Sequence, residues 1–571
     1  MLSVSLTNTN QTENPESVLS NDPISYTEAM SRPDSELWKQ ATRNEWESLL
    51  LNNTFELSGY QPQHAKEGES QNNQSGIPFG IHAIGSKWVY KRKLNPDGTT
   101  RYKVRLVVKG YEQVEGIDFK ETYAPVSKLT TVRMLLNLAA KYDWRVDHLD
   151  VVTAFLNPKI DRDNVYMSLP PGIDWLDPDL YQSSIHCVRL LKALYGLKQA
   201  PRLWYEDINQ FLLSIGFEQS TTDPNLYIQH SVLLLLYVDD ILLVSTGNND
   251  SSSDIKEKIQ NRYQTMDLGP VKRFLGLEIE RDVKQRSITL SQSEYIKSIL
   301  NRYQMQSSHS VSSPMDPNID LNNLNCHDKF VADRNLYLSI VGSLMYAALG
   351  TRPDISFAVT VLSRYNIQPL QMHLTAAKRV LRYLKSTAHY KIHFIGQQAS
   401  SEIENSLGIC GYTDSDWAGN TLDRKSVGGC IFTGNGITGG PILWQAKSQT
   451  VVALSTLEAE YIACSDATRE GLWLRRLHQD IISSINSQVT PNNEPIPIMC
   501  DNQGALKLIE TGVVKQKTKH IDVKFHHSHH EQKAGNIIFR YIPSNENTAD
   551  LLTKALPAPR HQQLTRMINI F

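Results

Sequence analysis

The sequence contains few cysteines, and none of them has the spacing typical of a metal site or a disulfide framework. Six cysteines are spread over 571 residues, and no two of them form a CxxC pair. This spacing argues against a zinc ribbon and against the dense disulfides of a small secreted domain. Reduced thiols in an intracellular compartment are the simplest interpretation.

A secretion signal, a long hydrophobic run and a strong net charge are also missing. The N-terminal segment MLSVSLTNTNQTENPES lacks the basic stretch followed by an apolar one that marks a signal peptide. The longest apolar run, LLLLYVDDILLV at 233–244, is too short to cross a bilayer and contains two aspartates. The formal net charge is -2, so only a local basic cluster could indicate nucleic-acid binding.

The chain is long enough, and apolar enough, to form several cores. It has 571 residues, of which 40% are hydrophobic. The polar segment 1–36 predicts a disordered leader, and 61–76 is a low-complexity insertion. Residues 87–110 alternate and turn at NPDG, which predicts a hairpin with eight basic residues and one acidic residue. Helical periodicity appears at 130–143 and 201–217.

Three aspartates follow alternating apolar segments. Asp239 and Asp240 come after LLLLYV, and Asp150 lies in VDHLDVVTAFL. Carboxylates at strand ends can meet at one sheet edge and supply the oxygen ligands that Mg²⁺ prefers, and two such ions can stabilise a phosphoryl transfer. The alternative is a simple hairpin turn between two apolar strands. The two interpretations are compatible, because turns often present functional ligands.

Further blocks surround these aspartates in a specific order. They are KWVYKRKLNPDG, RLVVKG, GIDFKETYAPVSKLTTVRMLL, LYGLKQAPRLWY, YVDD and DLGPVKRFLGLEI. Over about residues 37–300 this set resembles the reverse transcriptase of copia-type LTR retrotransposons. The resemblance implies an α+β right-hand polymerase with fingers, palm and thumb, in which Asp150, Asp239 and Asp240 bind the metal ions.

The same resemblance assigns residues to the nucleotide pocket. Phe155 matches the steric gate, an aromatic ring that would clash with a ribose 2′-OH and so favour deoxynucleotides. Gly196, Lys198 and Pro201 match a block that shapes the nucleotide and template pocket, although Ala200 stands where relatives often have Ser.

Two further groups have alternatives of similar weight. Lys103 and Arg105 are candidates for gripping the incoming triphosphate, and the alternative is a solvated basic face. Phe274, Leu275 and Gly276 match the primer-grip hairpin, and the alternative is ordinary core.

A second set of acids lies in the C-terminal third: Asp414, Glu458, Asp501 and Asp550. The segments from 407 onward predict the order strand, strand, strand, helix, strand, helix, strand, helix. In such a mixed sheet these carboxylates can converge on two metal ions that activate water against an RNA phosphate. Each acid also has a structural alternative: Ser455 and Glu458 fit a capping box, Asp501 could cap a helix, and Asp550 could complement a helix N-terminus.

This region resembles the ribonuclease H domain of the same elements over about 340–556. The matching blocks include TRPDISFAV, GYTDSDWAGN, VALSTLEAEYIA, CDNQGALKL and ADLLTKAL. Many ribonucleases H have a catalytic His shortly before the last Asp, but FRYIPSNENTAD has none. His526 and His530 have the i, i+4 spacing of zinc ligands, although a surface or nucleic-acid-facing cluster is the favoured interpretation.

These observations predict an α+β polymerase followed by a ribonuclease H-like α/β domain. The expected parts are a disordered leader (1–36), a copia-type reverse transcriptase (37–305), a linker and connection (306–404), a ribonuclease H-like domain (405–556) and a C-terminal tail (557–571). The expected activities are RNA-directed DNA synthesis and cleavage of RNA in RNA–DNA hybrids, with two Mg²⁺ ions, or Mn²⁺, at each site. The alternative is a catalytically silent remnant that only binds nucleic acid through the basic hairpin.

The resemblance also implies partners and locations. The partners are an RNA template, a DNA or tRNA primer, an RNA–DNA hybrid and dNTPs, with no membrane. The expected locations are a cytoplasmic virus-like particle and, secondarily, the nucleus. The chain shows no zinc knuckle, protease motif or integrase motif, so it is expected to be a processed product, a truncated reading frame or a genomic remnant.

Overall fold

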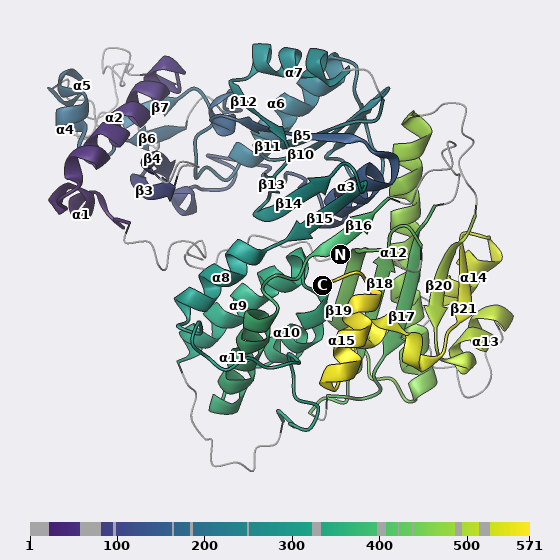
Figure 1. Ribbon diagram of the computed structural model, residues 1–571. Coiled ribbons are helices and arrows are strands. Elements are labelled where there is room, and N and C mark those ends of the chain that lie inside the picture. The colour runs from purple at the N-terminus through teal and green to yellow at the C-terminus, as the bar shows by residue number, and fades with distance from the viewer. Residues whose placement is uncertain are drawn as a thin grey trace.

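In the computed structural model, the described part of the chain folds into five β-sheets with helices packed around them (Figure 1). The described residues are 22–56, 82–94, 99–162, 165–182, 187–247, 251–322, 333–396, 407–420, 422–436, 439–485, 494–512 and 526–571. The low-complexity insertion at 61–76 and the NPDG turn lie outside them. Among these residues, no helix combines the length and the apolar character needed to cross a membrane.

The N-terminal part contains the predicted basic hairpin and a small four-stranded sheet. Strands β3 (Ser86–Leu94) and β4 (Thr100–Val108) pair in antiparallel register, and helix α2 (Ser35–Leu51) packs on β4. Beside them, β1 (Phe55–Glu56), β7 (Cys187–Leu190), β6 (Tyr166–Ser168) and β2 (Ala83–Ile84) form a sheet in the order β1-β7-β6-β2.

A six-stranded sheet forms the centre of the polymerase-like part. Its order is β12 (Thr265–Pro270), β5 (Arg145–Val151), β11 (Asp240–Ser245), β10 (Val232–Tyr237), β9 (Leu226–Gln229) and β8 (Glu218–Gln219). Helices α6 (Ala200–Ser214) and α7 (Ser251–Arg262) contribute to the core on one face, and α3 (Leu129–Tyr142) contributes to the core on the other. Neighbouring leucines of β10 therefore point into different cores, which explains why the strand is apolar throughout.

A fourth sheet connects the polymerase-like part to the C-terminal region. Its order is β13 (Arg273–Phe274), β14 (Leu277–Asp282), β15 (Ser287–Ser291) and β16 (Ile392–Ile395). Helices α8 (Ser293–Arg302), α9 (Arg334–Gly350), α10 (Ser356–Ser363) and α11 (Gln371–Ser386) form a bundle with its own core. Because β16 follows this bundle in the chain, the predicted connection segment is built into the sheet that begins in the polymerase part.

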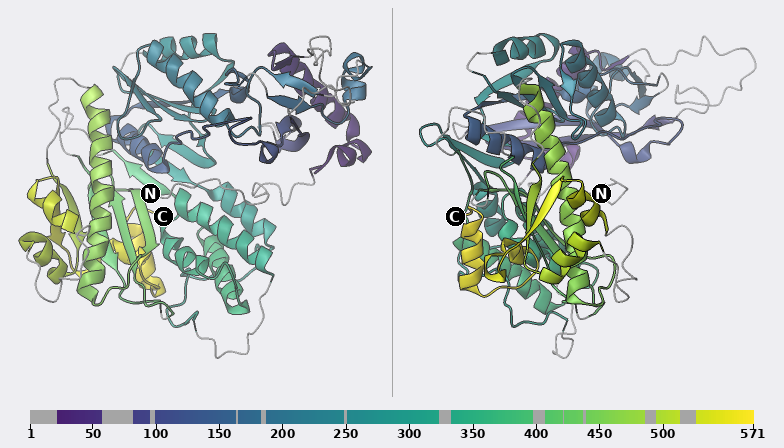
Figure 2. Two further views of the ribbon diagram at one scale, coloured as in Figure 1. Left: turned by 180° about the vertical axis from the view of Figure 1, so that it is seen from behind. Right: turned by 90° about the vertical axis from the view of Figure 1, so that its right-hand side faces the viewer.

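The C-terminal region is built on a five-stranded mixed sheet. Its order is β19 (Pro441–Ser448), β18 (Val427–Thr433), β17 (Cys410–Ser415), β20 (Ile496–Cys500) and β21 (Ile537–Tyr541), with β17, β20 and β21 parallel. The 30-residue helix α12 (Thr456–Ile485) packs on β17 and β18 and extends to the six-stranded sheet (Figures 1 and 2). Helices α13 (Gln503–Thr511) and α14 (His527–Lys533) precede β21. The predicted order of elements is therefore present up to β21, with α14 in addition. The last predicted helix, in NENTADLLTKAL, is instead a pair of short 3-10 helices, Ser544–Glu546 and Thr548–Leu552.

Two segments differ from the expectation of a loose leader and a tail. Helix α1 (Tyr26–Ser31) lies inside the predicted leader. It is stabilised by Ser25, which caps its N-terminus, and by the burial of Ala29. Helix α15 (Ala558–Met567) and the residues after it pack firmly, and Ile570 forms a β-bridge with Ile392. The described parts of both segments thus belong to the fold.

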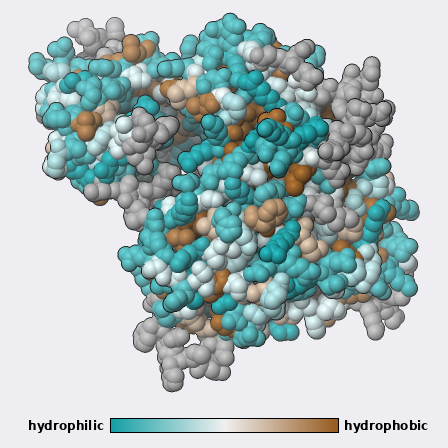
Figure 3. Space-filling model, in the orientation of Figure 1, coloured by the Kyte–Doolittle hydropathy of each residue, from teal (hydrophilic) through white to brown (hydrophobic). Residues whose placement is uncertain are grey.

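The surface in Figure 3 is mostly hydrophilic, and its apolar residues occur in small, separated groups.

The α+β architecture predicted from the sequence, with a polymerase part and a ribonuclease H-like part, is confirmed.

Candidate active sites

The first candidate site lies where three strands of the six-stranded sheet meet. Asp150 of β5 stands directly opposite Asp240 of β11 in antiparallel register. Residues in such a pair project from the same face, with Cβ atoms about 5 Å apart. Asp239 lies in the two-residue turn between Tyr237 and Asp240. The structure therefore brings the three predicted aspartates together.

The turn that carries Asp239 is fixed by hydrogen bonds from two neighbours. Val238 has a left-handed φ of 57°, which is unusual for a β-branched residue. The indole Nε1 of Trp204 donates to the carbonyl of Val238 at 2.7 Å, and the N–H of Val151 donates to the carbonyl of Asp239 at 2.9 Å. These contacts hold a strained turn in place, and strain of this kind is common at functional sites.

The charges at this site are poorly compensated. Burial raises the pKa of Asp150, and the neighbouring Asp240 raises it further. Burial likewise raises the pKa of Asp239, followed by repulsion from Asp240. Asp240 itself lies 2.9 Å from Nε2 of His148. A divalent cation would relieve this repulsion, and carboxylate oxygens are the ligands that Mg²⁺ prefers.

The residues predicted for the nucleotide pocket surround an aromatic ring that the sequence reasoning did not single out. Tyr195 makes an edge contact with Phe155, with centroids 5.3 Å apart, and the Arg105 guanidinium lies 4.5 Å from its ring centre. Lys103 lies on the same strand as Arg105, and burial lowers its pKa. Tyr195 lies inside the LYGLKQAPRLWY block, directly before Gly196, so its position was the available signal.

Gly196, Lys198 and Pro201 have structural roles around this pocket. Gly196 has φ +94°, and a Cβ there would lie 2.0 Å from the carbonyl oxygen of Val108. Lys198 donates to the Gln113 carbonyl at 3.3 Å. Pro201 stands at the start of α6, where a missing N–H costs nothing. These contacts fix the block against β4 and the following loop.

The second candidate site lies at the ends of β17 and β20. Asp414 belongs to β17, Asp501 follows β20, and these strands are parallel neighbours. Asp550 lies in a short 3-10 helix, Thr548–Leu552. The Lys554 ammonium bridges two of these acids, at 3.1 Å from Asp414 and 2.5 Å from Asp550.

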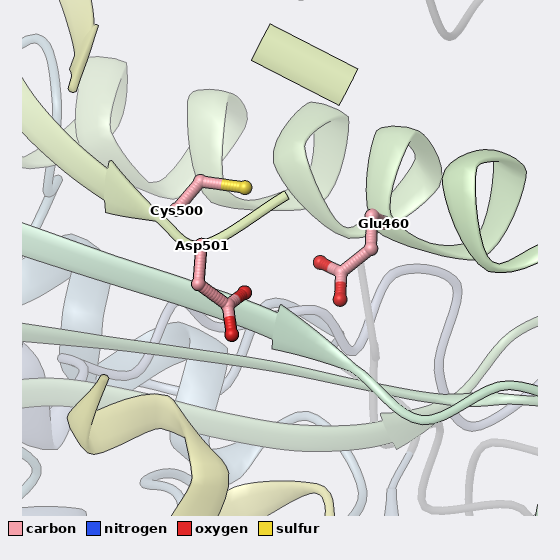
Figure 4. Close-up of side chains that lie close together, drawn as sticks. All are labelled: Glu460, Cys500 and Asp501. Atoms are coloured by element: carbon pink, nitrogen blue, oxygen red, sulfur yellow. The ribbon is translucent and has the colours of Figure 1, made fainter. Parts of the chain in front are cut away.

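The structure corrects the predicted glutamate of this set. The Glu458 carboxylate accepts the N–H of Leu454 at 2.7 Å, and the Ser455 hydroxyl accepts the N–H of Glu458, so this residue caps α12. Residues two apart on a helix do not share a face. Glu460 lies beside Asp501 and Cys500, with one ligand atom of each within 4.8 Å of the others (Figure 4). The capping alternative therefore describes Glu458, and Glu460 joins the acids.

Glu460 and Asp414 are buried among other acids. Burial raises the pKa of Glu460 to about 10, and Asp414, Cys500 and Asp501 add to the effect. Burial raises the pKa of Asp414 to about 6. Within the described part of the chain, Oε2 of Glu460 is buried without a hydrogen-bond partner. An unsatisfied buried carboxylate oxygen of this kind fits a hard divalent cation such as Mg²⁺.

The two histidines considered for zinc do not belong to the metal-compatible group among the described residues. Nδ1 of His526 lies 2.9 Å from the Tyr461 hydroxyl. His530 lies in the last turn of α14. The metal-compatible group found among the described residues contains Glu460, Cys500 and Asp501, and neither histidine belongs to it.

Comparison with known proteins identifies the family. The family described as Reverse transcriptase (RNA-dependent DNA polymerase) matches residues 74–317. The Pol polyprotein of transposon TNT 1-94 from Nicotiana tabacum is 36% identical over 96% of this chain, and that of RE1 from Arabidopsis thaliana is 35% identical over 94%. A Ty5-1 transposon protein of Saccharomyces cerevisiae is 32% identical and is covered over its whole length. The chain belongs to the copia-type retrotransposon Pol polyproteins.

The chain spans only part of these Pol polyproteins, 39% of the TNT 1-94 protein and 34% of the RE1 protein. Among solved structures, a foamy viral protease-reverse transcriptase in complex with RNA/DNA hybrid is 13% identical, with a TM-score of 0.44, over 92% of this chain and 64% of that one. An RNase H1 in complex with RNA/DNA hybrid is 19% identical, with a TM-score of 0.18, over 25% of this Pol chain and 93% of that chain.

Proposed function

We propose that this chain is an RNA-directed DNA polymerase that copies retrotransposon RNA into DNA and also cleaves the RNA strand of RNA–DNA hybrids. The observation that carries the proposal is the register pair of Asp150 with Asp240, with Asp239 in the adjoining turn. Family membership supports the same activity. The acids around Asp414 and Glu460 support a separate nuclease centre.

In the polymerase reaction, the primer 3′-OH attacks the α-phosphate of a dNTP and pyrophosphate leaves. Two Mg²⁺ ions, or Mn²⁺, would supply charge stabilisation when bound to Asp150, Asp239 and Asp240. The chain itself presents these acids from adjacent strands, with Trp204 holding the turn rigid. Preorganised groups of this kind stabilise a transition state without having to reorganise during the reaction.

Selection of the nucleotide would depend on residues of β4 and the loop after β5. Lys103 and Arg105 would supply positive charge for the triphosphate. Phe155 would exclude a ribose 2′-OH, and Tyr195 supports both sides of this pocket through its contacts with Phe155 and Arg105.

In the nuclease reaction, the oxygen of water forms a bond to the phosphorus of an RNA phosphodiester, the bond from that phosphorus to one ribose oxygen breaks, and this oxygen leaves as a hydroxyl group. The acids proposed to hold the metal ions are Asp414, Glu460, Asp501 and Asp550. Choice of the RNA strand would come from contacts with the 2′-OH and from the shape of the hybrid. The partners are accordingly an RNA template, a DNA or tRNA primer, dNTPs and the hybrid product, in a virus-like particle and in the nucleus.

Extension of a DNA primer on an RNA template, with Mg²⁺ and dNTPs, tests the polymerase. Asp239→Asn should abolish extension because it removes one charge from the triad. Asp254→Asn is the matched control, since Asp254 is exposed on α7 and pairs with Lys258. Equal activity in wild type and Asp239→Asn would refute the proposed site. Salt-sensitive binding without product under any metal would instead support the silent remnant.

Cleavage of a labelled RNA–DNA hybrid tests the nuclease. Asp501→Asn should abolish cleavage and leave primer extension intact. The control is Asp466→Asn, which changes an acid of α12 that pairs with Arg469. Loss of both activities in Asp501→Asn would argue against two separate sites.

A further inference from the structure

The last turn of α9 is contacted by three parts of the fold. A helix leaves its final carbonyl groups without intrahelical partners. Here Nε1 of Trp444, on β19, donates to the carbonyl of Ala348 at 2.8 Å. The Arg133 guanidinium, on α3, donates to the carbonyls of Leu349 and Gly350. The nuclease sheet and the polymerase core therefore meet on the same helix end.

Arg133 is buried, and its positive charge lies at the C-terminal end of α9. Burial lowers its pKa to about 9, and its guanidinium lies 3.8 Å from the ring centre of Trp444. A cation at a helix C-terminus is stabilised by the helix dipole. Trp444 thus contacts both α9 and Arg133. It therefore connects the contact that β19 makes with α9 to the contact that α3 makes with α9.

The third contact is made by Tyr346, one turn before the end of α9. Its hydroxyl donates to the carbonyl of Leu275 at 3.0 Å. Leu275 and Gly276 form the tip of the β13–β14 hairpin, and both have left-handed φ values of 52° and 76°. A Cβ on Gly276 would lie 2.4 Å from the Tyr346 hydroxyl oxygen. The hairpin tip and this hydroxyl are therefore fitted closely to each other.

Phe274, the residue just before this tip, links the hairpin to the aspartates of the six-stranded sheet through His148. Phe274 is buried, and its ring makes an edge contact with His148 at 5.6 Å. His148 in turn lies 2.9 Å from a carboxylate oxygen of Asp240. A continuous set of contacts thus runs from Asp240 through the 274–276 hairpin to α9, and from α9 to the nuclease sheet.

We propose that Tyr346 is a positioning residue that holds the 274–276 hairpin against the primer strand and ties its place to that of the nuclease region. This inference rests on the proposed function, because it assumes that the hairpin contacts a primer. The last turn of α9 then keeps the primer terminus and the RNA cleavage position at a constant separation. Loss of the Tyr346 hydroxyl loosens the hairpin without touching the nucleotide pocket.

The test uses the full chain with Tyr346→Phe, which removes one hydroxyl and keeps the ring. Tyr295→Phe is the matched control, because Tyr295 packs on Tyr346 at 4.7 Å and donates to the Ser343 carbonyl at 3.0 Å, away from the hairpin. Trp444→Phe is a second variant that removes the donor to α9 on the nuclease side.

Three quantities are measured on a labelled primer–RNA template: the rate of primer–template dissociation, the KM for dNTP, and the distribution of RNA cleavage positions relative to the primer terminus. Tyr346→Phe should raise dissociation about three- to tenfold, the range expected for one hydrogen bond. It should also broaden the cleavage positions and leave KM within about twofold of wild type. Trp444→Phe should broaden the cleavage positions as well.

The inference would be overturned if Tyr346→Phe and Tyr295→Phe showed the same rate of primer–template dissociation and the same distribution of cleavage positions. A change confined to the KM for dNTP would also overturn it. Dissociation is measured without catalysis, so a wild type that binds primer–template but makes no product refutes the proposed function and still decides the role of Tyr346.

Discussion

Neutralising one glutamate of α12 should both stabilise the protein and stop hybrid cleavage. At pH 7 the buried Glu460 carries a proton, because burial raises its pKa to about 10 from an ordinary value of 4.5. The unfolded chain would ionise it. An acid with a raised pKa costs no stability at low pH, and the cost grows as pH rises above the unfolded value. Glu460→Gln removes that cost.

The size of the effect follows from this difference. The ordinary pKa of 4.5 lies 2.5 units below pH 7, so at about 1.4 kcal/mol per unit the cost in folding free energy has a ceiling of about 3.5 kcal/mol. We expect Glu460→Gln to raise the free energy of unfolding by about 1–3 kcal/mol at pH 7 in EDTA, with the gain vanishing near pH 4. Urea unfolding at several pH values measures it. Cleavage of the hybrid should fall by about 100-fold or more, as when one electrostatic group is removed from an active site.

Glu458→Gln is the matched control two residues away. A Gln side chain can still accept the N–H of Leu454, as in capping boxes that use Gln. Stability should therefore change by less than about 0.5 kcal/mol, and cleavage should stay near that of wild type. The reasoning is refuted if Glu458→Gln abolishes cleavage while Glu460→Gln retains it, or if Glu460→Gln destabilises the protein at pH 7.

Three further predictions concern the other groups of the two sites. Phe155→Val should raise the incorporation of rNTP relative to dNTP in primer extension at least tenfold, about 1.4 kcal/mol, because the ring that would meet the 2′-OH is removed; an unchanged ratio would contradict its role. Lys554→Met should lower the stability in EDTA by about 1–2 kcal/mol, since Asp414 and Asp550 lose their shared cation, with a discount because Lys554 is partly exposed; Mg²⁺ should restore part of this in a thermal melt. Gly196→Ala should cost about 3 kcal/mol or more, because it combines a left-handed φ with a clash against Val108, and a stable variant in urea unfolding would contradict the structure there.

The proximity of the three aspartates proposed for the polymerase site could be predicted from the sequence because it depends on local structure. Asp239 and Asp240 are adjacent, and Asp150 sits on a strand whose apolar alternation is visible, so two strands suffice to bring them together. The chain has many other aspartates, however, and the ordered blocks around these three made the assignment specific. The place of Tyr195 in the LYGLKQAPRLWY block does not reveal its role, because its contacts with Phe155 and Arg105 depend on tertiary structure.

The glutamate of the proposed nuclease site could not be chosen from sequence alone because two glutamates lie two residues apart within STLEAEY. The capping-box spacing of Ser455 and Glu458 is visible in the sequence, but this spacing alone does not show whether Glu458 caps the helix or binds a metal ion. Which face of α12 meets β20 depends on tertiary packing, and that packing selects Glu460. The contacts at the C-terminal end of α9 could not be predicted from the sequence for a similar reason, because Arg133 and Trp444 are far apart in the chain.

Buried acids elsewhere in the molecule show why the two sites differ from ordinary ion pairs. Asp354 is fully buried, but the Arg352 guanidinium beside it lowers its pKa, and the Tyr383 hydroxyl donates to it at 2.7 Å. Asp147, on the same strand as Asp150, is paired with Lys256 at 2.8 Å. By contrast, burial and like charges raise the pKa of Asp150, Asp239 and Glu460. Burial also raises the pKa of Asp414, and the Lys554 ammonium 3.1 Å away offsets this only in part. A fold that can pair its buried acids, yet leaves these carboxylates under-compensated at two sheet ends, gives up stability at both places, as is expected where added divalent cations complete the charge balance.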